Sequence, residues 1–445
     1  MLGLSHSQKK DIGLDFVLAN LQLQSPYGHM ALKGIMPYTP KNKKQLENCF
    51  DNIQKLMEAN LGDMPMMLAH FKNISGILEK LKNHENLDEV ELFEIKAFLL
   101  NFEKFLPAFD KLNDKLSLAN IHFVPLIAPL NTLDPLKARI APFSIGGEFS
   151  QALIDIRQRK LASCQKTRPA IVEEETKEEL RVMMELSDKI RKHLRAFDNN
   201  IKSLGQLDLT MAKATLAKSG GTRPIITKDT IKLKGMTNPM VAAALSESGS
   251  LLVPVDISLA TGTTIITGAN MGGKSVAIKT VSLNVALCLL GFFPFADYAE
   301  VALVDGIFLI MEDMQNLKQG LSSFGGEISR LNTLLDAIGS QFLLIALDEF
   351  AKTTNPKEGA AIVRATAAHL AAQKCISLLS THYDQVPKKG MSHYQVKGMT
   401  NTDGRMDYSL QKVEYNSPIP KNALNICEAL GLNPALLDKI KQELI

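Results

Sequence analysis

The sequence has no long apolar run, and this absence excludes two classes of protein. Its N-terminus, MLGLSHSQKKDIGLDF, lacks the apolar core of a signal peptide. No stretch approaches the roughly 20 uninterrupted apolar residues of a membrane span. We therefore expect a cytoplasmic protein that has no membrane partner.

Paired cysteines and a strong net charge are also missing. The 5 cysteines are odd in number, lie far apart and form no CxxC pair, so neither a disulfide framework nor a zinc site is indicated. Lysine and arginine total 50 against 47 acidic residues, which gives only faint support for a polyanionic partner such as nucleic acid. With 445 residues and 45% apolar content, the chain is globular and long enough for two or three domains.

The first half of the chain has helical periodicity. Apolar residues recur at three- and four-residue spacing over Lys43–Leu61, Met64–Leu81, Leu87–Asn113 and Gln151–Leu204. A proline-rich break at Ile121–Gly147 separates two helical blocks. The pattern predicts long antiparallel helical arms.

The second half alternates between strand and helix patterns. A linker, KSGGTRP, begins at Lys218, and strand-like segments follow it, among them TTIIT before Gly268, Val301–Met311 and FLLIAL before Asp348. This rhythm is typical of βαβ units on a mainly parallel sheet. We predict a helical core and lever domain over 1–217 and an α/β ATPase domain over 218–445 that ends in two short dimerisation helices.

The segment GANMGGKS fits the phosphate-binding pattern G-x-x-x-x-G-K-[ST], and it follows a predicted strand and opens a predicted helix. Backbone N–H groups of such a loop surround phosphates, and the helix N-terminus adds partial positive charge. Lys274 is expected to reach the β- and γ-phosphates of ATP, and Ser275 to ligate Mg²⁺. The predicted nucleotide-binding residues are Gly268, Ala269, Asn270, Met271, Gly272, Gly273, Lys274 and Ser275.

Two further strand ends carry polar side chains. Asp348 and Glu349 follow an apolar strand, so we expect Asp348 to hold Mg²⁺ through water and Glu349 to orient or deprotonate the attacking water. His382 follows the strand ISLLS, and a neutral imidazole there can hydrogen-bond the water or the γ-phosphate. Lys274, Glu349 and His382 are thus the predicted catalytic residues.

At these motifs the sequence resembles the MutS family, whose ATPase is of the ABC type. GANMGGKS resembles that family's GPNMGGKST, LDEFAKTTNPKEG its DELGRGTSTxDG, STHYD its ATHYxEL, and GLSSFGGEI its GxSTFMxEM. The resemblance extends over most of residues 205–445, and more weakly to Leu14–Pro37 and Glu148–Lys160, which are similar to the core and lever segments.

The resemblance implies a homodimer with composite ATP sites, in which a serine of the partner completes each nucleotide site. Ser322 matches that serine, and Ser323 matches the threonine beside it. A serine pair before FGGEISRL also suits a helix N-cap, so both roles stay open.

The sequence departs from the family pattern at several positions. Ala351, Lys352 and Thr353 replace Gly-Arg-Gly, which affects the expected dimer contacts, and Leu252 stands where many members have an aromatic that packs on adenine. Residues 1–205 are too few for the mismatch-reading, connector and full lever domains. We expect a minimal core of levers and ATPase.

Two functions follow from this resemblance. The first is a dimeric ATPase whose nucleotide state controls binding to duplex or branched DNA in repair or recombination, without a wedge that reads mismatches. The second is an ATPase that remodels a protein client, such as a cobalamin-dependent aminomutase that needs its damaged cofactor replaced. The segment Ala119–Gly147 between the levers has only Lys137 and Arg139 as strong bases, which favours the second.

Overall fold

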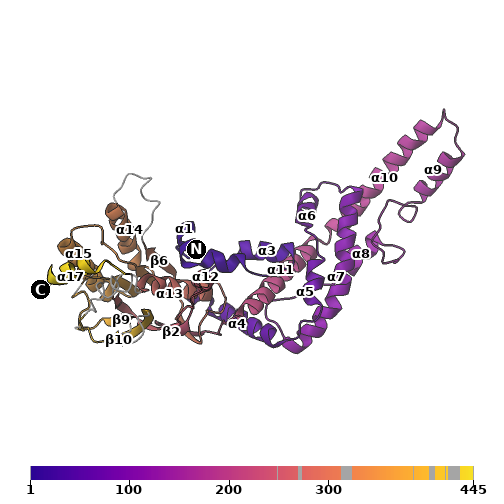
Figure 1. Cartoon of the computed structure of the whole chain (residues 1–445). Coiled ribbons are helices and arrows are strands. Elements are labelled where there is room, and N and C mark those ends of the chain that lie inside the picture. Colours follow the sequence, from indigo (N-terminus) through magenta and orange to yellow (C-terminus); the bar gives the residue numbers. More distant parts are fainter. Residues whose placement is uncertain are drawn as a thin grey trace. The chain divides into compact units, whose positions relative to one another are not determined.

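The computed structural model describes residues 2–247, 249–268, 273–311, 323–383, 385–399, 406–415, 417–418 and 431–443. The chain forms two compact units. The sheet unit consists of Met1–Leu21, Met36–Phe50 and Thr215–Ile445, and the helical unit of Gln22–Ile35 and Asp51–Ala214 (Figure 1). The architecture is therefore a helical N-terminal region together with a mixed α/β domain.

The helical unit contains, in its described residues, only helices and loops. Its helices are α3 (Pro26–Lys33), α5 (Met64–Ala69), α6 (Ser75–Lys82), α7 (Glu89–Leu116), α8 (Ile127–Leu133), α9 (Gln151–Ala162), α10 (Arg168–Arg191), the second half of α4 (Lys43–Glu58) and most of α11 (Leu194–Ala217).

Helix α7 organises the core of the helical unit. It begins with a capping box, in which Asp88 accepts from the N–H of Glu91 and the Glu91 side chain accepts from the N–H of Asp88. Its buried face presents phenylalanines that pack on aromatic rings of other segments with centroid distances of 4.7–6.2 Å. The aromatic core comprises Tyr27, Phe71, Phe98, Phe102, Phe105, Phe109, Phe123 and Phe197.

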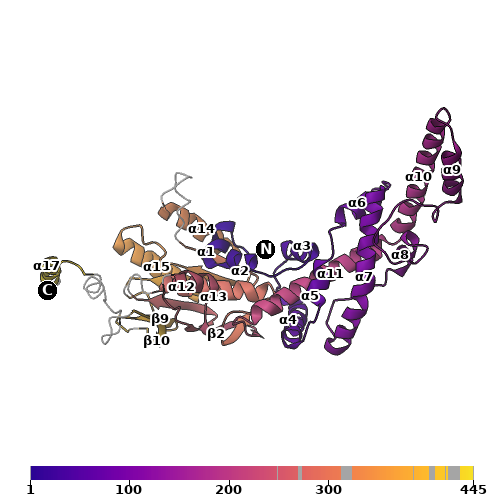
Figure 2. The same cartoon turned by 45° about the vertical axis from the view of Figure 1, so that its right-hand side comes forward.

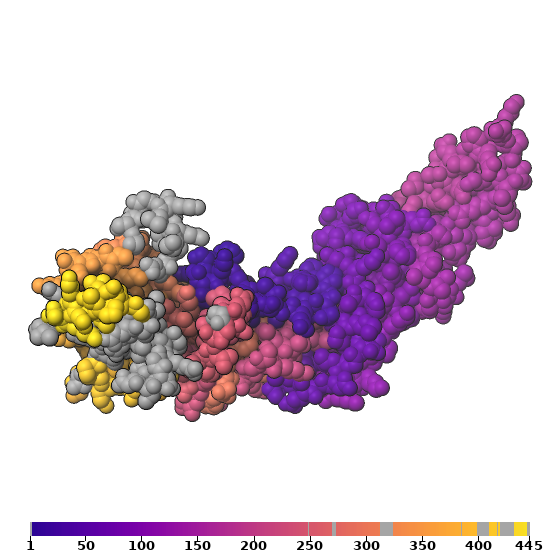
Figure 3. All heavy atoms as spheres, in the orientation of Figure 1, coloured from indigo at the N-terminus to yellow at the C-terminus, as the bar shows by residue number. Residues whose placement is uncertain are grey.

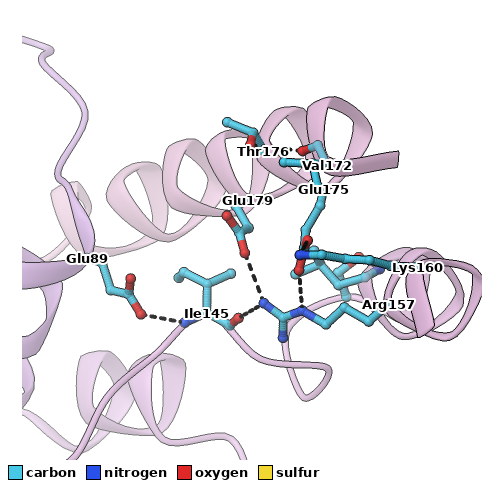
Figure 4. Close-up of polar contacts among 10 residues, drawn as sticks. Glu89, Ile145, Arg157, Lys160, Val172, Glu175, Thr176 and Glu179 are labelled. Carbon is cyan, nitrogen blue, oxygen red and sulfur yellow. Dashed lines mark hydrogen bonds and ion pairs between the residues drawn. The ribbon is translucent and has the colours of Figure 1, made fainter. Parts of the chain in front are cut away.

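Helices α9 and α10 form a hairpin that extends beyond α7 and α8 within the helical unit in both cartoon views and in the space-filling view (Figures 1, 2 and 3). Its two helices are joined by a polar network (Figure 4). Arg157 donates to Glu175, Glu179 and the carbonyl oxygen of Ile145, each at 2.9 Å, and Lys160 pairs with the other oxygen of Glu175. Because Glu175 is buried, these charge-assisted bonds determine how the two helices fit together.

The sheet unit contains two sheets and the remaining helices. The helical segments are α1 (His6–Ile12), α2 (Leu14–Ala19), η1 (Pro40–Asn42), α12 (Pro239–Glu247), α13 (Lys274–Leu289), α14 (Ser323–Ile338), α15 (Pro356–Ala371) and α17 (Pro434–Glu443). The strands are β1 (Ile225–Thr227), β2 (Thr230–Met236), β3 (Val255–Ala260), β4 (Gly262–Thr267), β5 (Tyr298–Ala302), β6 (Gly306–Ile310), β7 (Leu343–Leu347), β8 (Ile376–Thr381), β9 (Ser392–Met399) and β10 (Met406–Val413).

The larger sheet has the strand order β10-β9-β4-β8-β7-β6. Its pairs β4–β9, β4–β8, β7–β8 and β6–β7 are parallel, and β9–β10 is antiparallel. The smaller sheet, β1-β5-β2-β3, has one parallel and two antiparallel pairs. Apolar residues of α14 and α15 cluster with those of β4, β6, β7 and β8, so these helices pack on the larger sheet.

The N-terminal segment packs on the sheet unit. The N–H of Ile307 donates to the Leu2 carbonyl, Gln8 donates to Leu309, and Asn238 donates to Ile12. Helices α1 and α2 also contact α13. The predicted domain boundary between residues 217 and 218 stays a prediction. The boundary between the compact units lies between Ala214 and Thr215, and residues 1–21 and 36–50 belong to the sheet unit.

Some predicted element bounds were wrong. The pattern over Met64–Leu81 is two helices, because the chain breaks between them where the Tyr27 hydroxyl bonds the backbone of Lys72 and Ile74. The pattern over Val301–Met311 divides between β5 and β6, which belong to different sheets. The long pattern from Gln151 divides into α9, α10 and α11.

Candidate functional site

Three neighbouring parallel strands, β4, β8 and β7, bring the predicted residues to one edge of the larger sheet. Thr267 at the end of β4 is level with Thr381 of β8, and Leu347 of β7 is level with Leu379. Residues that follow these strands therefore emerge side by side. They are Gly268 after β4, His382 after β8, and Asp348 and Glu349 after β7.

Gly268 and Gly273, which lie at the two ends of the loop between β4 and α13, have backbone conformations that favour glycine. Gly268 has φ 142°, and a Cβ there would lie 3.1 Å from Cβ of Val396. Gly273 has φ 87° and directly precedes α13. Helix α13 begins at Lys274, so Lys274 and Ser275 lie in its first turn, where backbone N–H groups have no partner within the helix.

Lys274 is almost fully buried, with 3% of its surface exposed. Its Nζ donates to the carbonyl oxygen of Gly268 at 2.9 Å and lies 3.4 Å from Oε1 of Glu349. The start of α13 therefore contacts both the residue after β4 and the residues after β7. A buried ammonium group that pairs with a carboxylate is well suited to exchange that partner for an anionic ligand.

Glu349 lies between two lysines. Its Oε1 faces Lys274, and its Oε2 accepts from Nζ of Lys352 at 3.2 Å. Burial raises the pKa of Glu349, but the charges and hydrogen bonds of the two lysines outweigh burial and hold the pKa below its ordinary value. The carboxylate is consequently ionised at neutral pH.

Asp348 is oriented by Ser380 of β8. The Ser380 hydroxyl donates to Oδ1 of Asp348 at 2.6 Å and accepts from the N–H of Glu349 at 2.9 Å. Ser380 thereby holds both carboxylate residues at the strand end. Sequence reasoning missed this role, although the position of Ser380 near the end of the apolar strand that precedes His382 could have indicated it.

A pocket of about 410 Å³ lies beside these residues. Its lining includes Gly273 and the polar residues Lys274, Ser275, Thr280 and Glu349. Most of the other lining residues are aliphatic, and none of the described residues that line the pocket is aromatic. The remaining lining residues are Met236, Val241, Leu245, Ser250, Leu251, Leu252, Val253, Val255, Val276 and Ala277.

Residues 264–443 match the family model of MutS domain V. A protein named Endonuclease MutS2 from Caldanaerobacter subterraneus is 27% identical over 60% of this chain and 34% of its own length. Those from Halothermothrix orenii and Streptococcus agalactiae are 30% and 25% identical over 58% and 88% of this chain. Residues 264–443 therefore belong to the MutS family.

The matches cover 32% of the Halothermothrix relative and 50% of the Streptococcus relative, so the chain spans from about a third to about half of their length. No helix in the residues that the structure describes is long and apolar enough to cross a lipid bilayer.

His382, the third predicted catalytic residue of this MutS-family chain, has an exposed side chain. Its ring centroid lies 4.3 Å from that of Tyr383. The strand order places His382 at the same sheet edge as Glu349, and its role toward a nucleotide stays a prediction.

Several predicted residues lie outside the described ranges. These are Ala269, Asn270, Met271, Gly272 and Ser322. Ser323 is the first residue of α14, and its side chain is not among those described. Their predicted contacts with a nucleotide therefore stay predictions.

Proposed function

We propose that this MutS-family chain binds ATP and Mg²⁺, hydrolyses ATP as a homodimer, and uses the nucleotide state to control binding to duplex or branched DNA. The observation that carries the ATP part is the pocket, whose lining combines a lysine and a serine of a helix N-terminus with many aliphatic side chains. Phosphates suit the lysine and the serine, and a purine base suits the aliphatic side chains.

The residues of the pocket suit the phosphates of a nucleotide. Lys274 would neutralise phosphate charge, and the first N–H groups of α13 would donate to phosphate oxygens. Leu252 and its aliphatic neighbours would contact the base without ring stacking. The predicted loop 268–275 is the segment that would bind the phosphates.

Ser275 and Asp348 suit a magnesium ion, because a hydroxyl and a carboxylate oxygen are ligands that Mg²⁺ prefers. When bound, Mg²⁺ would neutralise the charge that develops on the transferred phosphoryl group. Asp348 already has one oxygen directed by Ser380. Glu349, ionised between two lysines, would orient the attacking water, and His382 would hydrogen-bond that water or the phosphate.

The homodimer with composite sites rests on the family, in which Ser322 of one protomer would contact the γ-phosphate bound to its partner. The DNA part rests on the same family and on relatives that are named Endonuclease MutS2. The matches span only part of those relatives, so we propose no nuclease activity for this chain.

The test is a titration of homoduplex and mismatched DNA at two salt concentrations, with an ATP analogue and with ADP, alongside Mg²⁺-dependent ATP hydrolysis. We expect both duplexes to bind alike, more weakly at high salt and differently with the two nucleotides, because phosphate contacts carry no sequence information. Sedimentation with the ATP analogue should show a dimer.

A chain without Mg²⁺-dependent hydrolysis would contradict the ATPase proposal. Hydrolysis without nucleotide-sensitive DNA binding at low salt would contradict only the DNA part, and the protein-remodelling function would then be the better account. A clear preference for the mismatch would contradict the expectation that no base wedge is used.

A further inference from the structure

The backbone of the loop after β7 is held by hydrogen bonds from three residues outside the loop. The Ser380 hydroxyl accepts from the N–H of Glu349. The N–H of Ala351 donates to Oε2 of Glu327 on α14 at 2.9 Å, and the Ala351 carbonyl accepts from the Tyr383 hydroxyl at 3.1 Å.

The conformation of this loop is unusual for its residues. Glu349 and Ala351 have φ of 46° and 58°, in the left-handed region that non-glycine residues seldom adopt. The surrounding contacts stabilise this conformation, and a Cβ on Gly359 would lie only 2.7 Å from the Ala351 carbonyl oxygen. The backbone on either side of Phe350 is therefore fixed, and Lys352 follows at once.

Lys352 and Lys274 bind different oxygens of the Glu349 carboxylate. Lys274 faces Oε1 at 3.4 Å, and Lys352 donates to Oε2 at 3.2 Å. The side chains of Glu349 and Lys352 are 17% and 29% exposed, so this is not a fully solvated surface pair, whose energy would be close to zero. The two lysines come from different segments: Lys274 lies in the candidate phosphate site, and Lys352 belongs to the same loop as Glu349.

We propose that Lys352 is a positioning residue that holds the Glu349 carboxylate in place when Lys274 turns to a bound phosphate. This inference rests on the ATPase function proposed above. Phosphate oxygens compete with Oε1 for the Lys274 ammonium group, and once Lys274 moves, Oε1 is available to accept a hydrogen bond from water. Oε2 stays on Lys352, which keeps the carboxylate from rotating.

The role proposed for Lys352 predicts different effects of its loss on nucleotide binding and on turnover. Lys352→Gln should lower kcat by about 10–100-fold, because a misdirected base loses its alignment with the reacting water. The Kd for ADP should change little, since Lys352 contacts Glu349 rather than the phosphates. Lys352→Arg keeps a cation in reach and should retain most of the turnover.

The experiment measures kcat, KM and the Kd for ADP in wild type, Lys352→Gln, Lys352→Arg and the control Lys357→Gln, an exposed lysine at the start of α15. Single-turnover rates of Glu349→Gln and of the double variant Glu349→Gln/Lys352→Gln complete the set. If Lys352 acts through Glu349, its loss should have no further effect in the Glu349→Gln background.

Three results would overturn the inference. They are a normal kcat in Lys352→Gln, a loss of ADP affinity as large as the loss of kcat, and additive losses in the double variant. If Lys352→Gln does not fold by circular dichroism, Lys352→Met, which keeps the length of the side chain, takes its place. A wild type without ATPase activity would instead count against the proposed function itself.

Discussion

Two glutamates of this protein, one in each compact unit, lie between two cations, and they show what such an arrangement can do. Glu175 in the helical unit binds Arg157 and Lys160, both from α9. Glu349 in the sheet unit binds Lys274 from α13 and Lys352 from its own loop. Hydrogen bonds from Lys160 and Arg157 lower the pKa of Glu175, and the lysines lower that of Glu349.

The difference lies in what else each cation can bind. Arg157 also donates to Glu179 and to a backbone carbonyl, so it is held by three groups of the fold (Figure 4). Lys274 lines the pocket, where a ligand anion can compete for it. We therefore expect the same pairing to be structural in the hairpin and exchangeable at the sheet edge.

Among the substitutions at the pair of Glu349 and Lys274, Glu349→Gln should have the largest effect, and this effect is on ATP hydrolysis. We expect nucleotide binding to persist and single-turnover hydrolysis to fall by about 10²–10⁴-fold, because an amide cannot accept the proton of the attacking water. Single-turnover assays with ATP check this, with the exposed Glu358→Gln as control. Normal turnover would remove Glu349 from the mechanism.

Lys274→Ala should have the next largest effect. It removes the cation that we assign to the phosphates, so affinity for ATP and ADP should fall by about 100-fold or more. Equilibrium binding measures this, and Lys279→Ala on the same helix, outside the pocket, serves as control. Equal affinity in the Lys274 and Lys279 variants would show that the pocket is not the phosphate site.

Arg157→Leu should break the structural pair. The change leaves Glu179 and the Ile145 carbonyl without their donor, and it should destabilise the helical unit by about 2 kcal/mol. Arg159→Leu is the matched control, since Arg159 and its partner Glu174 are 55% and 50% exposed and their pair contributes about 0.5 kcal/mol or less. Urea unfolding followed by circular dichroism compares the two, and equal losses would contradict the assigned role of Arg157.

Low pH should also lower the stability of the hairpin of α9 and α10, by less than Arg157→Leu does. Hydrogen bonds from Arg181 and Ser150 lower the pKa of Glu178 from 4.5 to about 2. A lowered folded-state pKa contributes stability above pH 4.5, and this contribution is lost as pH falls from 4.5 toward 2. Urea unfolding at pH 6, 4 and 3 should show the decline, and Glu178→Gln should make it shallower. An equal decline in both proteins would contradict this.

Much of the candidate site could be predicted from the sequence, because its residues follow local patterns. A glycine-rich loop between a strand and a helix, and carboxylates at the end of an apolar strand, depend on contiguous residues. The strand order and the parallel register bring Gly268, His382 and Asp348 to one edge of the sheet, whereas their roles toward a nucleotide stay predictions. Periodicity also indicated the helical N-terminal region, although it overlooked the breaks between helices that side chains such as Tyr27 stabilise.

The sequence by itself determined the two kinds of secondary structure and the MutS-family motifs, since both are encoded in short stretches of neighbouring residues. Only the tertiary structure decided that the first 21 residues pack on the sheet unit, that Ser380 orients Asp348, and that Lys352 shares Glu349 with Lys274. These contacts join residues distant in the chain or depend on a left-handed loop, and neither periodicity nor spacing encodes them.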